Sequence, residues 1–362
     1  MRSALILAGG RGERFWPWSR PGLPKQLLPL ADGKILLLAT LERLEGIVPP
    51  EATWILTSRD LAPRMQALVG KKARIVEEPV GRNTAPAIGY AALLSEALGA
   101  HDGMAVLAAD HLIPDLADFR KDLEAALKLA EDGDRLVTFG IRPTRPDTGF
   151  GYVEKGAPLG PERAFQVEAF REKPDLETAR EYVASGRHFW NSGMFAWRPR
   201  AILEGLERHR PALAQGVRSL EKAAKAYVAG KPAVAGDALD DVFPGLESVS
   251  IDYAVMEKAD NAAMIEASFE WDDLGSWTAW ARRQARDGRG NATSGRAVAI
   301  DSDECVVLGG GERPVVVLGG KGLIVVQHEG GTLVCPVERA DEVRKAVAEL
   351  DERGWLEEDP AR

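Results

Sequence analysis

The chain has 362 residues, a formal net charge of −9 and a composition that is 45% hydrophobic and 28% charged, which is typical of a soluble globular protein. At about 150 residues per domain, this length suggests two domains. The sequence contains no block of basic residues, which argues against nucleic acid as the main partner. It has no apolar run near the ~20 residues of a membrane span and no segment typical of a signal peptide. We therefore expect a cytoplasmic protein that is not associated with a membrane.

The cysteines and histidines indicate neither a disulfide nor a zinc site. Cys305 and Cys335 lie in apolar runs, where reduced thiols are a simpler interpretation than a disulfide. The five histidines show no spacing typical of metal ligands. The chemistry of this chain therefore has to come from other side chains.

The first 25 residues predict a loop that binds polyphosphate. An apolar run at residues 4–8 reads as a short buried parallel strand, and three glycines follow it, Gly9, Gly10 and Gly12. Glycines at a strand end let the backbone turn tightly and bring bare N–H groups against a phosphate. The loop also supplies its own cations, Arg11, Arg14 and, after a proline, Lys25.

Two familiar glycine motifs do not fit this loop. The dinucleotide fingerprint G-x-G-x-x-G would need glycine where this chain has Phe15, and a P-loop would need Lys-Ser or Lys-Thr after the glycines. The alternative is an ordinary strand–helix turn, which would not account for both arginines and the Pro-Lys pair. The pattern G-G-x-G-x-R followed by P-K resembles the signature of the sugar-nucleotide pyrophosphorylases, which are nucleotidyltransferases.

Strands and helices alternate through the first two-thirds of the chain. We expect strands at 4–8, 53–57, 73–76, 104–108 and 135–140, and helices that include 85–98, 119–130 and 211–230. This alternation predicts an α/β domain with a mostly parallel sheet covered by helices on both sides. Ligands of such sheets bind beyond the carboxyl ends of the strands, where the glycine loop lies.

The last quarter of the chain predicts a small all-β domain. The composition shifts near residue 287, so we expect a nucleotide- and sugar-phosphate-binding domain at 1–286 and a β domain at 287–362. Short β-type runs are separated by glycine-rich turns, at 297–300, 305–308, 315–318, 323–327 and 332–335. A final helix carries an apolar stripe from Val343 to Leu350. We expect this part to serve packing and self-association, not catalysis.

The segment E-P-V-G-R-N-T-A-P-A at residues 78–87 follows a strand and opens a helix. Glu78 is the first residue of this segment, Arg82 and Asn83 offer hydrogen-bond groups at the end of the strand, and Thr84 is placed to cap the helix. A capping turn alone would explain Thr84, but not the whole run. The whole run resembles the guanine-binding segment of one branch of the pyrophosphorylases, and this resemblance implies a nucleotide contact here.

Two carboxylates are candidate ligands for Mg²⁺. Asp110 ends an apolar strand in A-A-D-H, and W-D-D-L-G-S-W at 271–277 supplies a partner. Magnesium favours one or two carboxylates together with phosphate oxygens. Of the second pair we favour Asp273, with Asp272 as the alternative. His111 is interpreted as a structural neighbour of the site.

The sugar side is predicted from three motifs in the middle of the chain. T-G-F-G-Y-V-E at 148–154 places Gly151 for close backbone approach to a hexose. E-K-P offers the Glu172 carboxylate for hydroxyls and the Lys173 ammonium for a sugar phosphate, although a surface ion pair would explain these two residues alone. W-N-S-G-M-F adds the amide of Asn191 and the small Gly193.

Together with S-I-D-Y-A-V-M-E-K at 250–258, these motifs run in order from residue 4 to about residue 350 and resemble the mannose-1-phosphate guanylyltransferase family, the GDP-mannose pyrophosphorylases. The resemblance implies a nucleotidyltransferase α/β domain and a left-handed β-helical tail that serves dimerisation. It implies the substrates GTP and mannose 1-phosphate, the products GDP-mannose and diphosphate, and Mg²⁺ as cofactor. Longer members carry a phosphomannose isomerase domain, which we expect this chain to lack. The 250–258 segment is expected to support the sugar pocket without a catalytic role.

The resemblance also assigns roles to individual residues. It implies catalytic roles for Arg14, Lys25 and Asp110 and metal binding by Asp110 and Asp273. Nucleotide binding is implied for Leu7, Ala8, Gly9, Gly10, Arg11, Gly12, Glu78, Arg82, Asn83 and Thr84. Sugar-phosphate binding is implied for Gly151, Glu172, Lys173, Asn191 and Gly193. Alternatives are another nucleotide or sugar 1-phosphate, another acceptor such as a molybdopterin cofactor, or a non-catalytic regulatory paralogue that only binds sugar nucleotides.

Overall fold

The computed structural model describes residues 1–29, 33–160 and 163–356. The chain forms two compact units that are not continuous in sequence. The first unit comprises residues 1–9, 40–109 and 113–271, and the second comprises residues 10–39, 110–112 and 272–362. The glycine loop is therefore divided between them: Gly9 belongs to the first unit and Gly10 to the second. The predicted boundary at 286/287 stays a prediction.

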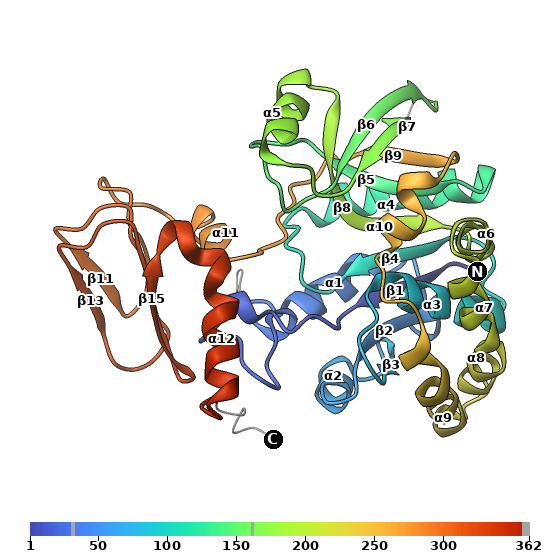
Figure 1. Cartoon of the computed structure of the whole chain (residues 1–362), viewed down its shortest axis with the longest axis horizontal. Coiled ribbons are helices and arrows are strands. Elements are labelled where there is room, and N and C mark those ends of the chain that lie inside the picture. Colours follow the sequence, from blue (N-terminus) through green and yellow to red (C-terminus); the bar gives the residue numbers. More distant parts are fainter. Residues whose placement is uncertain (30–32, 161–162, 357–362) are drawn as a thin grey trace. The chain divides into compact units, whose positions relative to one another are not determined.

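The first unit is built on a sheet of nine strands in the order β3-β2-β1-β4-β8-β5-β9-β7-β6 among the described residues (Figure 1). The strands are β1 (Ser3–Leu7), β2 (Thr53–Ser58), β3 (Arg74–Glu78), β4 (Met104–Ala108), β5 (Leu136–Ile141), β6 (Tyr152–Pro158), β7 (Ala164–Arg171), β8 (His188–Trp197) and β9 (Ala262–Glu266). The five strands expected from the sequence are all present.

Parallel pairing joins β3, β2, β1 and β4 and also joins β5 to β9. Strands β6, β7 and β8 pair antiparallel with their neighbours. Because β1 and β4 run parallel in register from Ser3↔Met104 to Leu7↔Ala108, their carboxyl ends lie at the same edge of the sheet. The glycine loop follows β1, and the A-A-D-H motif starts at the last residue of β4.

Helices accompany this sheet, some in contact with its strands and others packed on neighbouring helices. They are α2 (Ala62–Val69), α3 (Thr84–Leu98), α4 (Leu116–Gly133), α5 (Leu176–Ser185), α6 (Pro199–His209), α7 (Pro211–Ser219), α8 (Glu221–Val228), α9 (Pro232–Val242) and α10 (Ile251–Ala254). Three short 3-10 turns join them, η3 (Pro50–Ala52), η4 (Phe243–Gly245) and η5 (Met256–Lys258). Helix α1 (Leu36–Leu44) carries the chain from the second unit into the first.

The core of the first unit forms between α3 and the strands β1 and β4. Leu5, Met104 and Val106 are fully buried there, together with almost the whole length of α3. Helices α6, α7 and α8 lie along α3 (Figure 1). Helix α4 buries its apolar stripe, with Phe119 stacked on Phe139 of β5 at 6.3 Å between ring centroids. Such burial contributes about 25 cal/mol per Å² of apolar surface, which makes this core the main source of stability.

One helix prediction was wrong. The sequence pattern predicted a single helix over 211–230, but α7 ends at Ser219 and α8 begins at Glu221. The chain turns at Leu220, whose φ of −85° and ψ of 2° leave the helical range. This turn lets Leu220, Val217 and Ala224 all enter one buried core.

The second unit contains two short turns from the N-terminal motif and the C-terminal β structure. The turns are η1 (Glu13–Phe15) and η2 (Lys25–Leu27). The other elements are α11 (Trp277–Arg282), β10 (Ala292–Gly295), β11 (Ala297–Ile300), β12 (Val306–Gly309), β13 (Val315–Leu318), β14 (Leu323–His328), β15 (Gly331–Pro336), η6 (Val337–Glu342) and α12 (Val343–Glu352).

The C-terminal strands stack as expected for a β-helix-like domain. Strands β10, β12 and β14 pair in parallel as one sheet, β11 and β13 pair in parallel as another, and β15 closes the first sheet antiparallel to β14. The predicted β runs and the terminal helix are confirmed, and β10 is an additional strand. Cys305 is buried and Cys335 half-buried, and both are free thiols, as predicted.

Phe15 of the N-terminal motif belongs to the core of the second unit. It is 1% exposed and lies in one apolar cluster with Trp277, Val306, Ile324 and Val343. Its ring lies 5.0 Å from that of Trp277. The N-terminal motif is thus anchored on the β strands and on α12. No helix of the described residues is apolar enough over sufficient length to cross a bilayer.

Candidate functional site

The second unit contains a cavity of ≈ 510 Å³, which falls within the range of roughly 300–1,000 Å³ that is usual for small-ligand sites. The residues that line it are Arg11, Gly12, Glu13, Arg14, Phe15, Lys25, Asp110, His111, Asp273, Gly275 and Arg344. The cavity therefore brings together the motif arginines, the lysine and both predicted metal ligands, which lie far apart in the sequence.

Lys25 lies at the centre of this charge arrangement. It is only 5% exposed, and its Nζ lies 2.8 Å from Asp110 Oδ2. The same Nζ donates a hydrogen bond to the backbone carbonyl of Asp273. Lys25 begins the turn η2 directly after the extended Pro24, which fixes the direction of the chain. A buried ammonium held in this way is preorganised to stabilise negative charge that enters the cavity.

The pKa values of the two carboxyls of the cavity are shifted in opposite directions. Burial by itself would raise the pKa of Asp110, but the Lys25 ammonium and His111 bring it below its usual value. For Asp273, burial and the neighbouring Asp272 and Asp110 carboxylates outweigh Lys25 and raise the pKa to about 6. A divalent cation held by Asp110 and Asp273 would relieve this repulsion between carboxylates, so the two side chains fit such an ion.

Asp272 has other partners. Its Oδ2 lies 3.5 Å from Arg282 Nη2, and its Oδ1 accepts the amide hydrogen of Leu274 at 2.8 Å. Its backbone pairs with Leu112. Asp273 lines the cavity and Asp272 does not. Within the described ranges, no group of three or more His, Cys, Asp or Glu side chains is placed to hold a metal ion. A Mg²⁺ site completed by substrate phosphates does not require one.

The glycine loop is held through its carbonyl groups. Ser19 Oγ donates to the carbonyl of Gly12 at 2.7 Å, and Gln26 Nε2 donates to that of Gly10 at 3.0 Å. Gly12 has a φ of +64°, which glycine adopts without strain. Arg14, which is 43% exposed, donates to the carbonyl of Gly275 at 3.5 Å. The fixed carbonyls constrain the loop while its arginines face the cavity.

The residues predicted to bind the nucleotide are divided between the two units. The first unit holds Leu7, Ala8, Gly9, Glu78, Arg82, Asn83 and Thr84, and the second holds Gly10, Arg11 and Gly12. Leu7 ends β1 and its carbonyl accepts from the amide of Ala109, while the amide of Ala8 donates to Leu56 at 2.9 Å. A Cβ at Gly9 would lie 3.4 Å from Glu78 Oε2, so the loop start and the end of β3 are neighbours. Arg82 donates to the carbonyl of Pro244.

The predicted capping by Thr84 was wrong. Asn83 is the N-cap of α3, and its Oδ1 accepts from the amide of Thr84 at 2.9 Å. The backbone of Asn83 is in a positive-φ conformation, at 62°, which asparagine tolerates better than most residues. Thr84 instead uses its Oγ1 to accept from the amide of Ile251 at 2.9 Å, which ties the start of α3 to α10.

Burial raises the pKa of Glu78 to about 7, and its Oε1 has no hydrogen-bond partner in the described part of the chain. Because the folded-state pKa exceeds the unfolded value, this carboxyl stabilises the fold most below about pH 4.5, and the contribution is lost as pH rises through 7. Glu78→Gln should therefore raise Tm, relative to wild type, more at pH 8 than at pH 5.

The expected difference is about 2 °C or more, since about 1 kcal/mol shifts Tm by roughly 2–4 °C for a folding unit of about 150–250 residues. Thermal unfolding of both proteins at the two pH values measures it. Glu77→Gln is the matched control, because Glu77 is 51% exposed and pairs with Arg59. Equal Tm differences at the two pH values would contradict a raised pKa at Glu78.

The sugar-side residues also gather in the first unit. Gly151 packs so closely against Glu172 that a Cβ there would collide with Oε2. Glu172 has a side chain that is 10% exposed, and its Oε2 lacks a partner among the described residues. Burial, reinforced by the Asp252 and Glu257 carboxylates, raises its pKa to about 7. Lys173 Nζ lies 3.6 Å from the Glu172 carboxyl. The backbone of Lys173 has a φ of +46°, which is a strained conformation for a lysine.

Asn191 contacts Asp252, which lies in the 250–258 segment that was predicted to support the sugar pocket but was given no role of its own. Its Oδ1 accepts from Thr138 at 2.8 Å and from the amide of Gly193 at 3.3 Å, and its Nδ2 donates to Asp252 Oδ1 at 2.8 Å. Asp252 follows Ser250, the N-cap of α10, and burial raises its pKa. The sequence feature that could have indicated a role for Asp252 is its carboxylate in S-I-D-Y, two residues after a capping serine.

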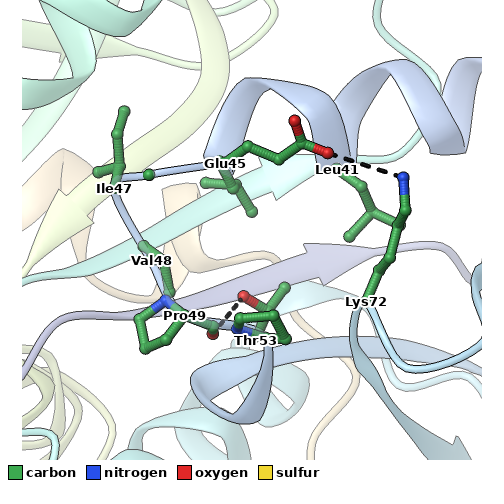
Figure 2. A pocket seen from close by; sticks show the side chains of 10 residues that line it. Leu41, Glu45, Ile47, Val48, Pro49, Thr53 and Lys72 are labelled. Carbon is green, nitrogen blue, oxygen red and sulfur yellow. Dashed lines mark hydrogen bonds and ion pairs between the residues drawn. The ribbon is translucent and has the colours of Figure 1, made fainter.

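A separate cavity of ≈ 380 Å³ lies in the first unit. Figure 2 shows side chains that line it. Glu45 and Lys72 approach each other to 3.6 Å across it, and Thr53 Oγ1 donates to the carbonyl of Pro49 at 3.1 Å. The remaining walls are mainly aliphatic, and none of the predicted site residues lines it. We assign it no part in the chemistry.

Comparisons with known proteins agree with this arrangement. Residues 3–288 match the family described as nucleotidyl transferase, and residues 295–350 match the MannoseP isomerase/GMP-like beta-helix domain. The xanthan biosynthesis protein XanB of Xanthomonas campestris pv. campestris (strain B100) is 39% identical over 358 residues, which cover 98% of this chain and 74% of that protein.

Two further relatives are similar over nearly the whole chain. A mannose-1-phosphate guanylyltransferase of Escherichia coli is 38% identical, with coverage of 95% of this chain and 72% of the relative. The crystal structure of a mannose-1-phosphate geranyltransferase from Thermus thermophilus superposes with a TM-score of 0.83 at 38% identity. That match covers 97% of this chain and 99% of the other.

Proposed function

Since the chain belongs to the nucleotidyl transferase family, we propose that it transfers the guanylyl group of GTP to α-D-mannose 1-phosphate and yields GDP-mannose and diphosphate. The observation that carries this proposal is the cavity in which Lys25, Asp110 and Asp273 meet the arginines of the glycine loop. The name of the relative from Escherichia coli supports the choice of mannose 1-phosphate and the guanylyl group.

In the proposed reaction an oxygen of the sugar phosphate attacks the α-phosphorus of GTP in line. The bond from that phosphorus to the bridging oxygen breaks, and diphosphate leaves with the electron pair. No protein nucleophile takes part, so catalysis consists of positioning and charge stabilisation. Lys25 neutralises charge around the α-phosphate. The amides of Gly9, Gly10 and Gly12, with Arg11 and Arg14, hold the triphosphate and the departing diphosphate.

The other site residues receive roles by the same proposal. Glu78, Arg82, Asn83 and Thr84, with Leu7 and Ala8, contact the nucleoside. Lys173 orients the sugar phosphate, and Glu172, Gly151, Asn191 and Gly193 surround the hexose. We add Asp252 as the residue that holds the Asn191 amide in place. The raised pKa of Glu172 supports a neutral carboxyl near pH 7 that can donate to a sugar hydroxyl.

Asp110 and Asp273 are the proposed ligands of Mg²⁺, which when bound supplies positive charge to the reacting phosphates. Asp273→Asn should raise the Mg²⁺ concentration required for half-maximal activity by about tenfold or more, while Asp272→Asn should stay close to wild type. Titration of activity with Mg²⁺ in the three proteins measures this. The opposite ranking of the two variants would make Asp272 the ligand.

We also propose that the protein is a cytoplasmic homodimer. Val298 and Ile300 of β11 and Val316 and Leu318 of β13 expose 44–72% of their surfaces on the small two-stranded sheet. Such a row of exposed apolar side chains is typical of a self-association surface. Sedimentation velocity of the purified protein measures the mass, and a monomer at micromolar concentration would refute the dimer.

The proposed reaction is tested by diphosphate release with mannose 1-phosphate and Mg²⁺, run in parallel with GTP, ATP, UTP and dTTP. We expect GTP to be preferred by orders of magnitude, because a site that hydrogen-bonds its base discriminates strongly. Faster diphosphate release with another nucleotide would be consistent with the same mechanism but would reject guanine as the preferred base. If no nucleotide gives diphosphate release, the remaining functions are transfer to another acceptor or regulatory binding without catalysis.

A further inference from the structure

Arg344 extends the charge arrangement of the cavity from the C-terminal helix. It is the second residue of α12 and lines the same cavity as Arg11, Arg14 and Lys25. Its neighbour Val343 is 3% exposed and packs in the apolar cluster that also contains Phe15. Because Phe15 follows Arg14 directly, the two arginines are carried by segments that share one core. The position of Arg344 is therefore fixed relative to the motif.

The other cations near Arg344 on this helix and the turn before it have carboxylate partners. Lys345 lies 2.7 Å from Glu342, Arg339 lies 3.0 Å from the same residue, and Arg353 pairs with Glu349. In the part of the chain that the structure describes, Arg344 makes no such ion pair or hydrogen bond. Arg11 is the second cavity arginine without one in those ranges. Two uncompensated guanidinium groups thus face one cavity in a protein of net charge −9.

The other charged residues of the cavity are the carboxylates Glu13, Asp110 and Asp273 and the cations Lys25 and Arg14. Lys25 contacts Asp110 and the Asp273 carbonyl, and the proposed reaction assigns it to the α-phosphate. Arg14 has weaker partners, the Gly275 carbonyl at 3.5 Å and Asp341 at 3.9 Å. Arg11, Arg14 and Arg344 therefore remain available to an incoming anion. Guanidinium groups bind phosphate oxygens in a bidentate manner, and several together suit a group with more than one phosphate.

We propose that Arg344 binds the β- and γ-phosphates of the nucleoside triphosphate and the diphosphate that they become. The inference rests on the proposed function for the identity of the nucleotide, but it concerns a residue outside the N-terminal motif. It makes the β-helix-like domain a contributor to substrate binding. This role goes beyond the packing and self-association predicted for that domain from its sequence.

The test compares Arg344→Gln with Arg353→Gln in the full-length protein. Arg353 is the residue that directly follows α12 in the sequence. It is 53% exposed and pairs with Glu349, so its replacement controls for loss of a surface charge. Isothermal titration with inorganic diphosphate in the presence of Mg²⁺ gives an affinity that does not depend on turnover. We expect Arg344→Gln to weaken diphosphate binding roughly tenfold or more, as for loss of a charge-assisted hydrogen bond. Arg353→Gln should match wild type.

Steady-state kinetics provide the second readout. In Arg344→Gln the KM for GTP, and for diphosphate in the reverse direction, should rise, while the KM for mannose 1-phosphate stays within about twofold. Arg344→Lys should fall between wild type and glutamine, because it keeps the charge and loses the fork geometry. If Arg344→Gln binds diphosphate as tightly as Arg353→Gln does, the inference is overturned. An equal rise of KM for all substrates in Arg344→Gln would also overturn it.

These results separate this inference from the proposed function. If wild type binds diphosphate and Arg344→Gln binds it more weakly, the inference stands even where GTP and mannose 1-phosphate give no turnover. If wild type makes GDP-mannose but Arg344→Gln binds diphosphate equally well, the reaction stands and the role of Arg344 is rejected. Failure of wild type to bind diphosphate would reject the role as well.

Discussion

Lys25→Ala is expected to reduce kcat by about 10²–10³-fold, the usual effect of removing one preorganised charge from a transition state. Lys25 is 5% exposed, and its ammonium contacts both Asp110 and the Asp273 carbonyl. Its removal takes away the buried cation nearest to the two carboxylates, which then repel each other and the substrate phosphates. Diphosphate release under saturating GTP and mannose 1-phosphate measures the effect.

The control for this substitution is Lys72→Ala. Lys72 is 65% exposed, pairs with Glu45 at 3.6 Å, and lies at the separate cavity of the first unit. It should retain wild-type turnover. Circular dichroism and thermal unfolding of Lys25→Ala establish that the protein is folded. A folded Lys25→Ala protein with turnover within about threefold of wild type would remove Lys25 from the mechanism, since roughly 10²-fold is expected.

Gly12→Ala should be nearly as damaging, although it changes no charge. Its φ is +64°, and an added Cβ would lie 2.5 Å from Lys25 Cβ and 2.7 Å from the Lys25 backbone nitrogen. Lys25 would have to shift, and a displacement of about 1 Å at a reacting group can cost 10²-fold in rate. We therefore expect kcat to fall by about 10²-fold, with a loss of stability from the strained backbone of about 1–2 kcal/mol.

Gly354→Ala separates backbone strain from displacement of Lys25. Gly354 also lies in the second unit with a φ of +68°, but an added Cβ there would meet nothing within 4 Å. This variant should lose stability and keep its turnover. If both glycine variants lose Tm equally and both keep wild-type kcat, Gly12 serves only the backbone turn and not the placement of Lys25.

Most of the fold followed from local patterns in the sequence. The apolar runs before the glycine loop and before A-A-D-H are strands β1 and β4, because short buried runs bounded by turn residues have few other solutions. The β runs after residue 295 and the final helix were likewise confirmed. The break at Leu220 could not be predicted, since both halves of 211–230 favour helix and only packing in the core distinguishes them.

The site residues were predictable in type but not in their connections. Lys25 stood out as the lysine that follows a proline in the glycine-loop motif, and Asp110 because it ends a strand of a parallel sheet, where ligands bind. Asp273 stood out because Mg²⁺ needs a partner carboxylate. Their mutual contacts depend on the tertiary structure, as does the link from Asn191 to Asp252. No sequence feature indicated that Arg344 belongs to the site, because one arginine in a charged amphipathic helix normally faces solvent. The helix that carries it packs in one core with Phe15, and this packing places Arg344 at the cavity.

The most direct test of the proposed reaction is a product balance from GTP, α-D-mannose 1-phosphate and Mg²⁺. Chromatography of the quenched reaction gives the amounts of GDP-mannose and diphosphate over time, with Lys25→Ala as the control protein. We predict equal amounts of the two products from wild type and at least about 10²-fold slower formation of both from the control. Diphosphate without an equal amount of GDP-mannose, or no product from wild type, would contradict guanylyl transfer to mannose 1-phosphate.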